Sequence, residues 1–196
     1  MKKIVFLLEE PSMKAFIEEF LPRLIPDLEF LCITHEGKQD LEKSIPRKLK
    51  AFRRELFVII RDNDGADCRA IKARLIDVCK NEGKSDVLIR IACQELESWY
   101  LGAMDILAAV YARPKLTGLN LKSKYRNPDR LGNPSSEVIK LIPEFRKIEG
   151  ARRMGMAMPL EKSDNYSRSF QVFIEGIQRM LKSTTGKKVR LRIRRE

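Results

Sequence analysis

The sequence has a single histidine, His35, among 196 residues, and this scarcity argues against several kinds of active site. Zinc sites and acyl-transfer triads usually draw on imidazole groups, so both are poorly supported here. The four cysteines are Cys32, Cys68, Cys79 and Cys93. Their wide spacing, without a C-x-x-C motif, predicts small buried side chains and no metal knuckle. Any catalysis must therefore depend on carboxylates.

No apolar run approaches the length of a membrane span, and the N-terminal apolar stretch lacks the small-residue cleavage site of a signal peptide. We therefore expect a cytoplasmic protein without a membrane segment. A hydrophobic content of 43% and a charged content of 34% are typical of a soluble globular chain. The net charge of +12 favours an anionic partner, with nucleic acid as the first candidate.

A short apolar run at residues 56–60 ends abruptly in three carboxylates. The run predicts a strand buried on both faces, as in a parallel sheet covered by helices. Asp62 and Asp64 follow at its carboxyl end, where ligands gather in open α/β sheets, and Gly65 permits a tight turn. Carboxylates at this spacing suit Mg²⁺. Asp67 has two open interpretations, a further metal ligand or the N-cap of the next helix.

The other apolar segments alternate between strand and helix periodicity, which predicts β-α-β units and an α/β fold. Ser12 is expected to cap the first helix, and Pro22 and Pro26 are expected to end it. Further strands are predicted at 3–8, 28–34 and 86–93, and helices at 13–20, 41–52, 69–83, 104–110, 136–142 and 167–181.

Carboxylates also stand at the ends of two other predicted strands. Glu9 follows the first strand, and Glu95 and Glu97 follow the fourth. Glutamate in the first turn of a helix stabilises the helix through its dipole and needs no other function. Taken by themselves, Glu95 and Glu97 therefore favour a structural role. Trp99 and Tyr100, in the same segment, are predicted to be core residues.

Basic residues gather in the loop at 122–136, near residue 150 and in the C-terminal tail. Tyr125 lies among the basic residues of the loop, a composition found in grooves that follow a nucleic-acid strand, although a solvated loop explains it equally well. The tail alternates apolar and basic residues and is either an edge strand or a disordered arm. The candidate nucleic-acid-binding residues are Lys122, Lys124, Arg126, Arg130, Arg152, Arg153, Lys187, Lys188, Arg190 and Arg192.

The motif order resembles the Toprim catalytic domain of topoisomerases, primases and the overcoming-lysogenization-defect nucleases. In that family an acidic residue after the first strand is followed by glycine and a helix, and Asp-x-Asp follows a later strand. EEPS at 9–12 and DND at 62–64 occupy those places here. Glu10 stands where the family has glycine, which leaves open whether Glu9 or Glu10 is the functional acid, with Glu9 aligning better.

More narrowly, the chain resembles a bacterial Toprim-like family of unknown function that is often encoded beside ABC-type ATPases and suspected in phage defence. The segments LLEEPSMKAF, RDNDGADC, RIACQELESWYLG, EGAR and Asn-x-Ser-x-Ser-Phe at 165–170 carry this resemblance. Ala103 stands where that family usually has aspartate. The resemblance implies a Toprim-like (Rossmann-like) fold with a mostly parallel sheet and a helical C-terminal extension, and it implies an ABC-type ATPase as a partner.

We accordingly expect an α/β core at 1–112, a basic loop and helical extension at 113–183 packed on that core, and a basic tail at 184–196. The leading hypothesis is a nuclease, an Mg²⁺- or Mn²⁺-dependent phosphodiester hydrolase that acts on nucleic acid as the effector of a phage-defence system.

In this hypothesis Asp62 and Asp64 bind the metal, and Glu9 is a further ligand or the general base. Glu95 or Glu97 completes a second metal position. The alternative is a non-catalytic module that binds nucleic acid or an ATPase, which the altered first turn and the missing acid at residue 103 favour.

Overall fold

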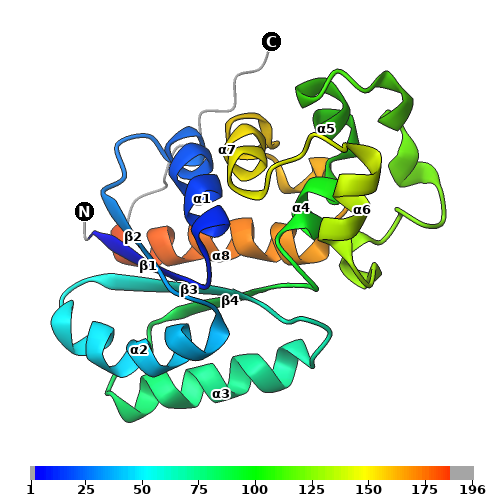
Figure 1. Cartoon of the computed structure of the whole chain (residues 1–196). Coiled ribbons are helices and arrows are strands. Elements are labelled where there is room, and N and C mark those ends of the chain that lie inside the picture. The colour runs from blue at the N-terminus through cyan, green and yellow to red at the C-terminus, as the bar shows by residue number, and fades with distance from the viewer. Residues whose placement is uncertain (1–2, 186–196) are drawn as a thin grey trace.

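Four parallel strands in the order β2-β1-β3-β4 form the middle layer of the computed structural model, which describes residues 3–185 (Figure 1). Their bounds are β1 (Ile4–Leu8), β2 (Phe30–Thr34), β3 (Leu56–Asp62) and β4 (Leu88–Ala92). All three strand pairs are parallel, so the carboxyl ends of the four strands lie at one edge. This arrangement confirms the predicted α/β class and is consistent with a Toprim-like or Rossmann-like fold.

The central strands are apolar on both faces because helices cover both sides of the sheet. In β1, Phe6 and Leu8 join one buried cluster, whereas Val5 and Leu7 join a second cluster on the opposite face. The residues of β2 are only half-buried, as expected for an edge strand. The sequence run that predicted a doubly covered strand therefore identified β3 correctly.

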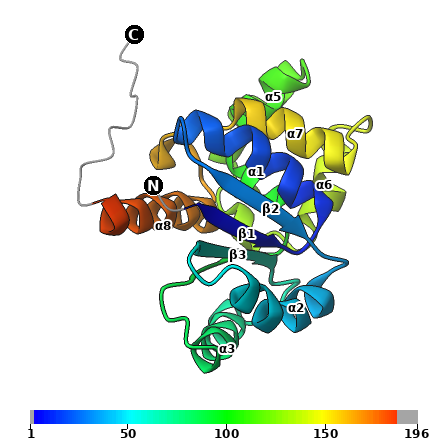
Figure 2. The ribbon, with the colours of Figure 1, turned by 90° about the vertical axis from the view of Figure 1, so that its left-hand side faces the viewer.

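Two of the crossover helices lie on one side of the sheet, and the first crossover helix lies on the other side together with the C-terminal helix (Figures 1 and 2). One face is covered by α2 (Lys38–Ala51) and α3 (Cys68–Asn81). The other face is covered by α1 (Pro11–Leu24) and α8 (Arg168–Thr185). Beyond that face lie α4 (Glu97–Gly102), α5 (Met104–Val110), α6 (Pro134–Leu141) and α7 (Lys147–Ala157).

Two expectations about α1 are wrong. The helix continues through Pro22 to Leu24, because proline removes a single intrahelical bond there while Leu21 and Leu24 stay buried in the same turn. Ser12 lies inside the helix and does not cap it; Glu10 is the N-cap residue and Pro11 opens the first turn.

The close approach of α7 to α1 fixes α7 against the helix layer that covers this face of the sheet. At Gly155 an added Cβ atom would lie 2.6 Å from the Phe16 carbonyl oxygen, so only glycine allows this close contact. Arg23 strengthens it by donating from Nη1 to the carbonyl oxygens of Gly155 and Met158, at 2.9 and 3.0 Å.

Core residues from both sides of position 112 share one cluster, among them Trp99 and Tyr100, which are buried as predicted. The division into parts at 112 and 183 stays a prediction.

Three of the four cysteines are half-buried and only Cys79 is buried, so the expectation of buried cysteines is wrong for the other three. Within residues 3–185, no helix combines the length and apolar content needed to cross a membrane.

Candidate active site

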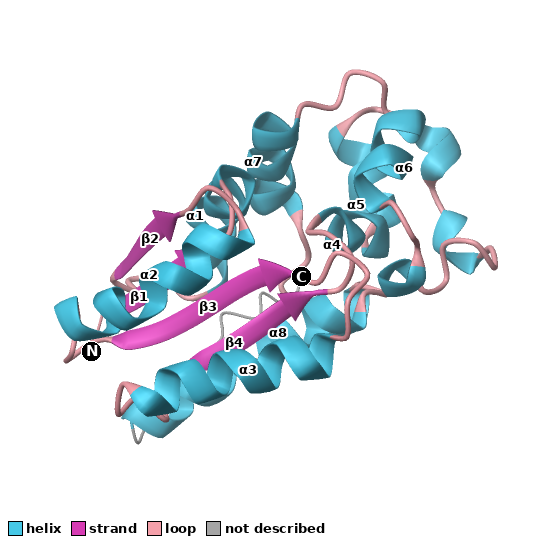
Figure 3. Ribbon diagram, turned by 60° about the horizontal axis from the view of Figure 1, so that its bottom comes forward, coloured by secondary structure: helices cyan, strands magenta, loops and turns pink. Residues whose placement is uncertain are grey.

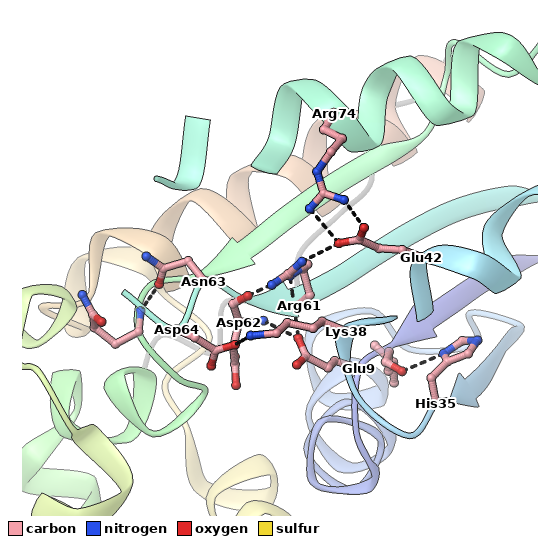
Figure 4. A network of polar contacts seen from close by, with 11 residues as sticks. Glu9, His35, Lys38, Glu42, Arg61, Asp62, Asn63, Asp64 and Arg74 are labelled. Carbon is pink, nitrogen blue, oxygen red and sulfur yellow. Dashed lines mark hydrogen bonds and ion pairs between the residues drawn. The ribbon is translucent and has the colours of Figure 1, made fainter. Parts of the chain in front are cut away.

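The carboxyl ends of β1, β3 and β4 bring together acids that are far apart in the sequence. Figure 3 shows the arrowheads of β3 and β4 pointing toward α4, whose first residue is Glu97. Asp62 is the last residue of β3, and its backbone N–H donates to Glu9 Oε2 at 3.0 Å (Figure 4). Glu9 and Glu97 both lie near enough to Asp62 for their charges to raise its pKa.

Asp62 and Glu97 are buried without hydrogen-bond partners for most of their carboxylate oxygens. Their exposed fractions are 6% and 1%. Asp62 Oδ1, both carboxylate oxygens of Glu97 and the hydroxyl of Tyr100 have no hydrogen-bond partner among the described residues. Buried polar groups are normally paired, so this cluster of unpaired oxygens stands out from the rest of the molecule.

Burial and mutual repulsion raise the pKa values of these acids. Burial raises the pKa of Asp62 well above its usual range, and the carboxylates of Glu10, Glu9, Glu97 and Asp64 raise it further. Burial also raises the pKa of Glu97 to about 7, although the Lys147 charge opposes the shift. These acids are thus held in a site that disfavours their charged forms.

Neighbouring groups partly offset the effect of burial on the pKa of Glu9. Burial raises the pKa of Glu9, while the bond from the Asp62 N–H and the charge of Arg61 lower it. The Arg61 Nε atom lies 3.8 Å from Glu9 Oε2.

Lys147 places a positive charge over the acidic cluster, and no sequence motif pointed to this residue. Lys147 Nζ donates to Glu10 Oε2 at 2.6 Å, and the Ser12 hydroxyl donates to Glu10 Oε1 at 2.5 Å. Burial lowers the pKa of Lys147, but the Glu10 hydrogen bond and the charges of Glu10, Glu97 and Asp62 outweigh it and raise that pKa. The start of α7 therefore faces the start of α1 across the site.

Two turns with positive φ values connect the strand ends. Asp64 has φ +48° and Gln94 has φ +65°, and such strained positions in non-glycine residues concentrate at functional sites. The Asp64 N–H donates to the Gln94 carbonyl oxygen at 3.1 Å, and the Gln94 N–H donates to Asn63 Oδ1. The turn after β3 and the turn after β4 thus form one hydrogen-bonded unit.

The other predicted acids lie away from the buried cluster or have other partners. Asp64 is exposed at the rim, where Lys38 Nζ lies 2.9 Å from its Oδ2. Asp67 caps α3, accepting from the N–H groups of Arg69 and Ala70 at 2.7 and 3.4 Å, so its capping interpretation is confirmed. Glu95 Oε2 accepts the N–H of Ser135 at 2.7 Å and ties α6 to the same edge.

A hollow of about 350 Å³ opens beside Asp64, and basic side chains line part of it. The buried Arg61 donates from Nη1 to Glu42 Oε1 at 2.5 Å, and the exposed Arg74 binds the same carboxylate (Figure 4). His35 is buried, with Nδ1 2.9 Å from the Leu8 carbonyl oxygen and Nε2 2.6 Å from the Ser44 hydroxyl. The single histidine therefore has a structural role.

The basic loop is more ordered than its composition indicated. Tyr125 is buried and its hydroxyl donates to Glu137 Oε1 at 2.6 Å, so it cannot stack on a base as one interpretation supposed. Lys124 Nζ lies 2.5 Å from the same Glu137 oxygen. The exposed candidates in the described residues are Lys122, Lys124, Arg126, Arg130, Arg152 and Arg153. The remaining four, Lys187, Lys188, Arg190 and Arg192, lie outside the described residues.

The carboxylate oxygens at this site are suitable ligands for a hard divalent cation, although they do not form a complete ligand set. Within residues 3–185, no three His, Cys, Asp or Glu side chains form a ready ligand set. The unpaired oxygens of Asp62 and Glu97 nevertheless offer the carboxylate donors that Mg²⁺ prefers, and Mg²⁺ needs few protein ligands because it keeps several waters.

The family model described as a domain of unknown function (DUF4276) matches residues 8–178. A solved structure of the C-terminal region of the Xanthomonas campestris pv. campestris OLD protein is similar at a TM-score of 0.48 and 14% identity, covering 89% of this chain and 94% of that chain. Among curated proteins, none matches the chain.

Proposed function

Because the chain belongs to the DUF4276 family, whose function is unknown, we propose a function from the site itself: a divalent-metal-dependent phosphodiesterase acting on nucleic acid. One observation carries this proposal. Asp62 and Glu97 hold unpaired carboxylate oxygens in a buried cluster at the carboxyl edge of a parallel sheet. Burying such charges is costly unless a cation compensates them, so the arrangement favours metal binding over a purely structural role.

Each acid has a distinct place in the proposed mechanism. Asp62 and Asp64 would hold Mg²⁺ or Mn²⁺, with Glu97 as a further ligand. Asp64 would first leave its ion pair with Lys38 at the rim. A metal held there would supply Lewis-acid chemistry for the phosphate and for the attacking water. Glu9 accepts the proton of the attacking water, because its pKa is already raised and only its Oε2 atom receives the Asp62 N–H. Glu10 is less suited to this task because Ser12 and Lys147 occupy both its oxygens.

Lys147 and the exposed basic side chains account for the substrate class. The Lys147 side chain is 51% exposed, so it can release Glu10 and meet a phosphate oxygen. The net charge of +12 adds long-range attraction for a polyanion. Such contacts position a phosphate backbone and give little sequence preference.

A second candidate is a non-catalytic module that binds nucleic acid or an ATPase. The ion pair between Lys147 and Glu10 favours it, because this pair neutralises part of the acidic cluster without any metal. An ABC-type ATPase and a role in phage defence are the partner and the context that the Toprim-like resemblance implies for either candidate.

Thermal unfolding with EDTA, Mg²⁺ or Mn²⁺ tests the proposal on the wild type and Asp62→Asn. Metal at about one hundred times its dissociation constant should stabilise the wild type by about 2.7 kcal/mol, or roughly 5–10 °C. Asp62→Asn should be as stable in EDTA, because the amide replaces an acid whose ionisation burial and its neighbours already oppose, and it should lose the metal response. Nicking of plasmid DNA by the wild type should require the metal and disappear in the variant.

Asp86→Asn is the matched control, because Asp86 precedes β4 at the opposite edge and its side chain is 60% exposed. This control should keep both the metal response and the nicking. A wild type that shows no melting shift with either metal, together with destabilised Asp62→Asn protein, would contradict the proposal and favour the module.

A further inference from the structure

Two cysteines that are 25 positions apart in the sequence face each other beside the candidate active site. The Sγ atoms of Cys68 and Cys93 lie 3.6 Å apart, at hydrogen-bonding distance. Cys68 is the first residue of α3, and Cys93 directly follows β4. Both are half-buried, so a small oxidant can reach them. We propose that Cys68 and Cys93 are a redox pair that hydrogen peroxide converts to a reversible disulfide.

The backbone on both sides of the pair is already fixed. Asp67 caps the helix that Cys68 begins, and the Cys93 N–H donates to the Ser169 hydroxyl oxygen at 3.3 Å. The turns next to the cysteines are tied together by the bond from the Asp64 N–H to the Gln94 carbonyl oxygen. Forming a disulfide of about 2.05 Å therefore requires the sulfurs to approach by roughly 1.5 Å, a change that side-chain rotation can supply.

The oxidation balances with the peroxide as the only co-reactant. The Cys68 thiolate attacks one peroxide oxygen, an S–O bond forms, the O–O bond breaks and hydroxide leaves as water after protonation. The Cys93 sulfur then attacks the Cys68 sulfenic acid, the S–S bond forms, the S–O bond breaks and a second water leaves with the Cys93 proton. Two thiols are oxidised and one peroxide is reduced to two waters.

The order of the two thiols follows from their surroundings. Burial, and to a smaller extent Asp129 and Cys68, raise the pKa of Cys93 to about 12, so Cys93 suits the second step. The disulfide would lock the turn that carries Asp62 and Asp64 to the turn that leads to Glu97. Formation of the bond does not depend on the proposed phosphodiesterase, whereas any effect on metal binding does.

Peptide mapping tests the bond directly. The full-length protein is treated with a small excess of hydrogen peroxide, free thiols are blocked, and trypsin is added without reductant. Cleavage after Arg61 and Arg69 releases peptide 62–69, and cleavage after Arg90 and Lys115 releases peptide 91–115; each contains one cysteine. We expect these two peptides to be joined, with a mass two hydrogens lower than their sum, and dithiothreitol to separate them.

Cys68→Ser and Cys93→Ser should each abolish the joined peptide, whereas Cys32→Ser, which changes a half-buried cysteine in β2, should keep it. In EDTA the oxidised wild type should melt on the order of 5 °C above the reduced protein, because the bond restrains the unfolded chain. Sulfinic or sulfonic acids without a cross-link, a cross-link to another cysteine, or unmodified thiols would overturn the proposal. An unchanged or lower melting temperature would overturn the locking of the two turns.

The peptide mapping and the melting in EDTA involve no metal. The disulfide proposal can therefore hold if the phosphodiesterase proposal fails, and it can fail if the phosphodiesterase proposal holds.

Discussion

The buried Glu97 carboxyl lowers the stability of the folded protein when it must be charged, because it lies away from water. It is 1% exposed, neither carboxylate oxygen has a partner among the described residues, and burial raises its pKa to about 7. An unfolded glutamate titrates near 4.3, so the folded protein keeps the Glu97 proton across the interval between these values. Glu97 therefore opposes folding at every pH at which the unfolded carboxyl is ionised.

The sign of the pH dependence follows from this difference. Below about pH 4.3 both states are protonated and Glu97 costs nothing, and as the pH rises toward 7 the unfolded state alone releases its proton. Stability in EDTA should fall over this interval by roughly 3 kcal/mol from Glu97. In Glu97→Gln this part of the fall should be absent, as measured by urea unfolding at pH 5 and pH 8.

Glu149→Gln is the comparison variant, since Glu149 is exposed on α7 and pairs with the surface residues Arg152 and Arg153. It should follow the wild-type pH profile. Parallel profiles for wild type and Glu97→Gln would show that Glu97 does not carry the cost. The slope is compared, and not the absolute stability, because the amide introduced by Glu97→Gln would itself lack a partner.

Single residues of the site were predictable only where they directly follow a strand. Glu9 and Asp62 come at the ends of apolar runs, so the rule for parallel sheets placed them at one edge. Lys147 was not predictable, because it opens a helix whose approach to Glu10 depends on packing far from either residue. The preference for Glu9 over Glu10 came from alignment alone, and the contacts of Glu10 now give a physical reason for it.

At the scale of elements, the position of α7 depends on Gly155, whose lack of a side chain allows α7 to approach α1 closely. Gly155→Ala should gain about 1 kcal/mol from helix propensity, but its Cβ would lie 2.6 Å from the Phe16 oxygen and 2.9 Å from Glu19 Cβ. These contacts involve the backbone and a Cβ atom, so the two helices must separate. We expect a net loss of roughly 1–2 kcal/mol in urea unfolding.

Met156→Ala is the control on the same helix, because Met156 is 51% exposed. It should change stability by less than about 0.5 kcal/mol. A Gly155→Ala protein as stable as the wild type would mean that α1 and α7 adjust freely, and that Lys147 is not held in place by this contact.

Elements were predictable where local pattern and tertiary environment agree. The run at 56–60 and the stripe at 167–181 matched β3 and α8 because each has one consistent period, and the Ser167 hydroxyl accepts the Phe170 N–H as a cap should. α7 was missed because Gly150 and Gly155 weaken the helix signal. Those glycines are there for close packing, which periodicity does not reveal.

At the scale of the whole molecule, the positive charge is expected to act mainly through many weak phosphate contacts. Removing residues 186–196 keeps all the described residues of α8 and deletes Lys187, Lys188, Arg190, Arg192, Arg194 and Arg195. If these side chains meet phosphates, binding to duplex DNA should weaken, and the log–log salt slope should fall by about 0.9 for each lost contact. Fluorescence anisotropy at several salt concentrations measures this slope.

Substitution of the same six residues by glutamine separates charge from chain length and should reproduce the change. An unchanged slope in both proteins would assign the tail another purpose. The total charge could be calculated from composition, but composition did not show that Lys124 and Tyr125 of the loop both bind Glu137 of α6.

The place of β1 in the sheet has a consequence for how the chain assembles. β1 is made before the other three strands during synthesis, yet it lies between β2 and β3, and Ile4 pairs with both Phe30 and Leu56. All five of its residues are apolar and fully buried, so they stay unpaired until the later strands exist. Contacts so distant in sequence slow folding and lengthen the exposure of apolar segments. The nascent chain must therefore keep its first strand from aggregating while its partners are still being translated.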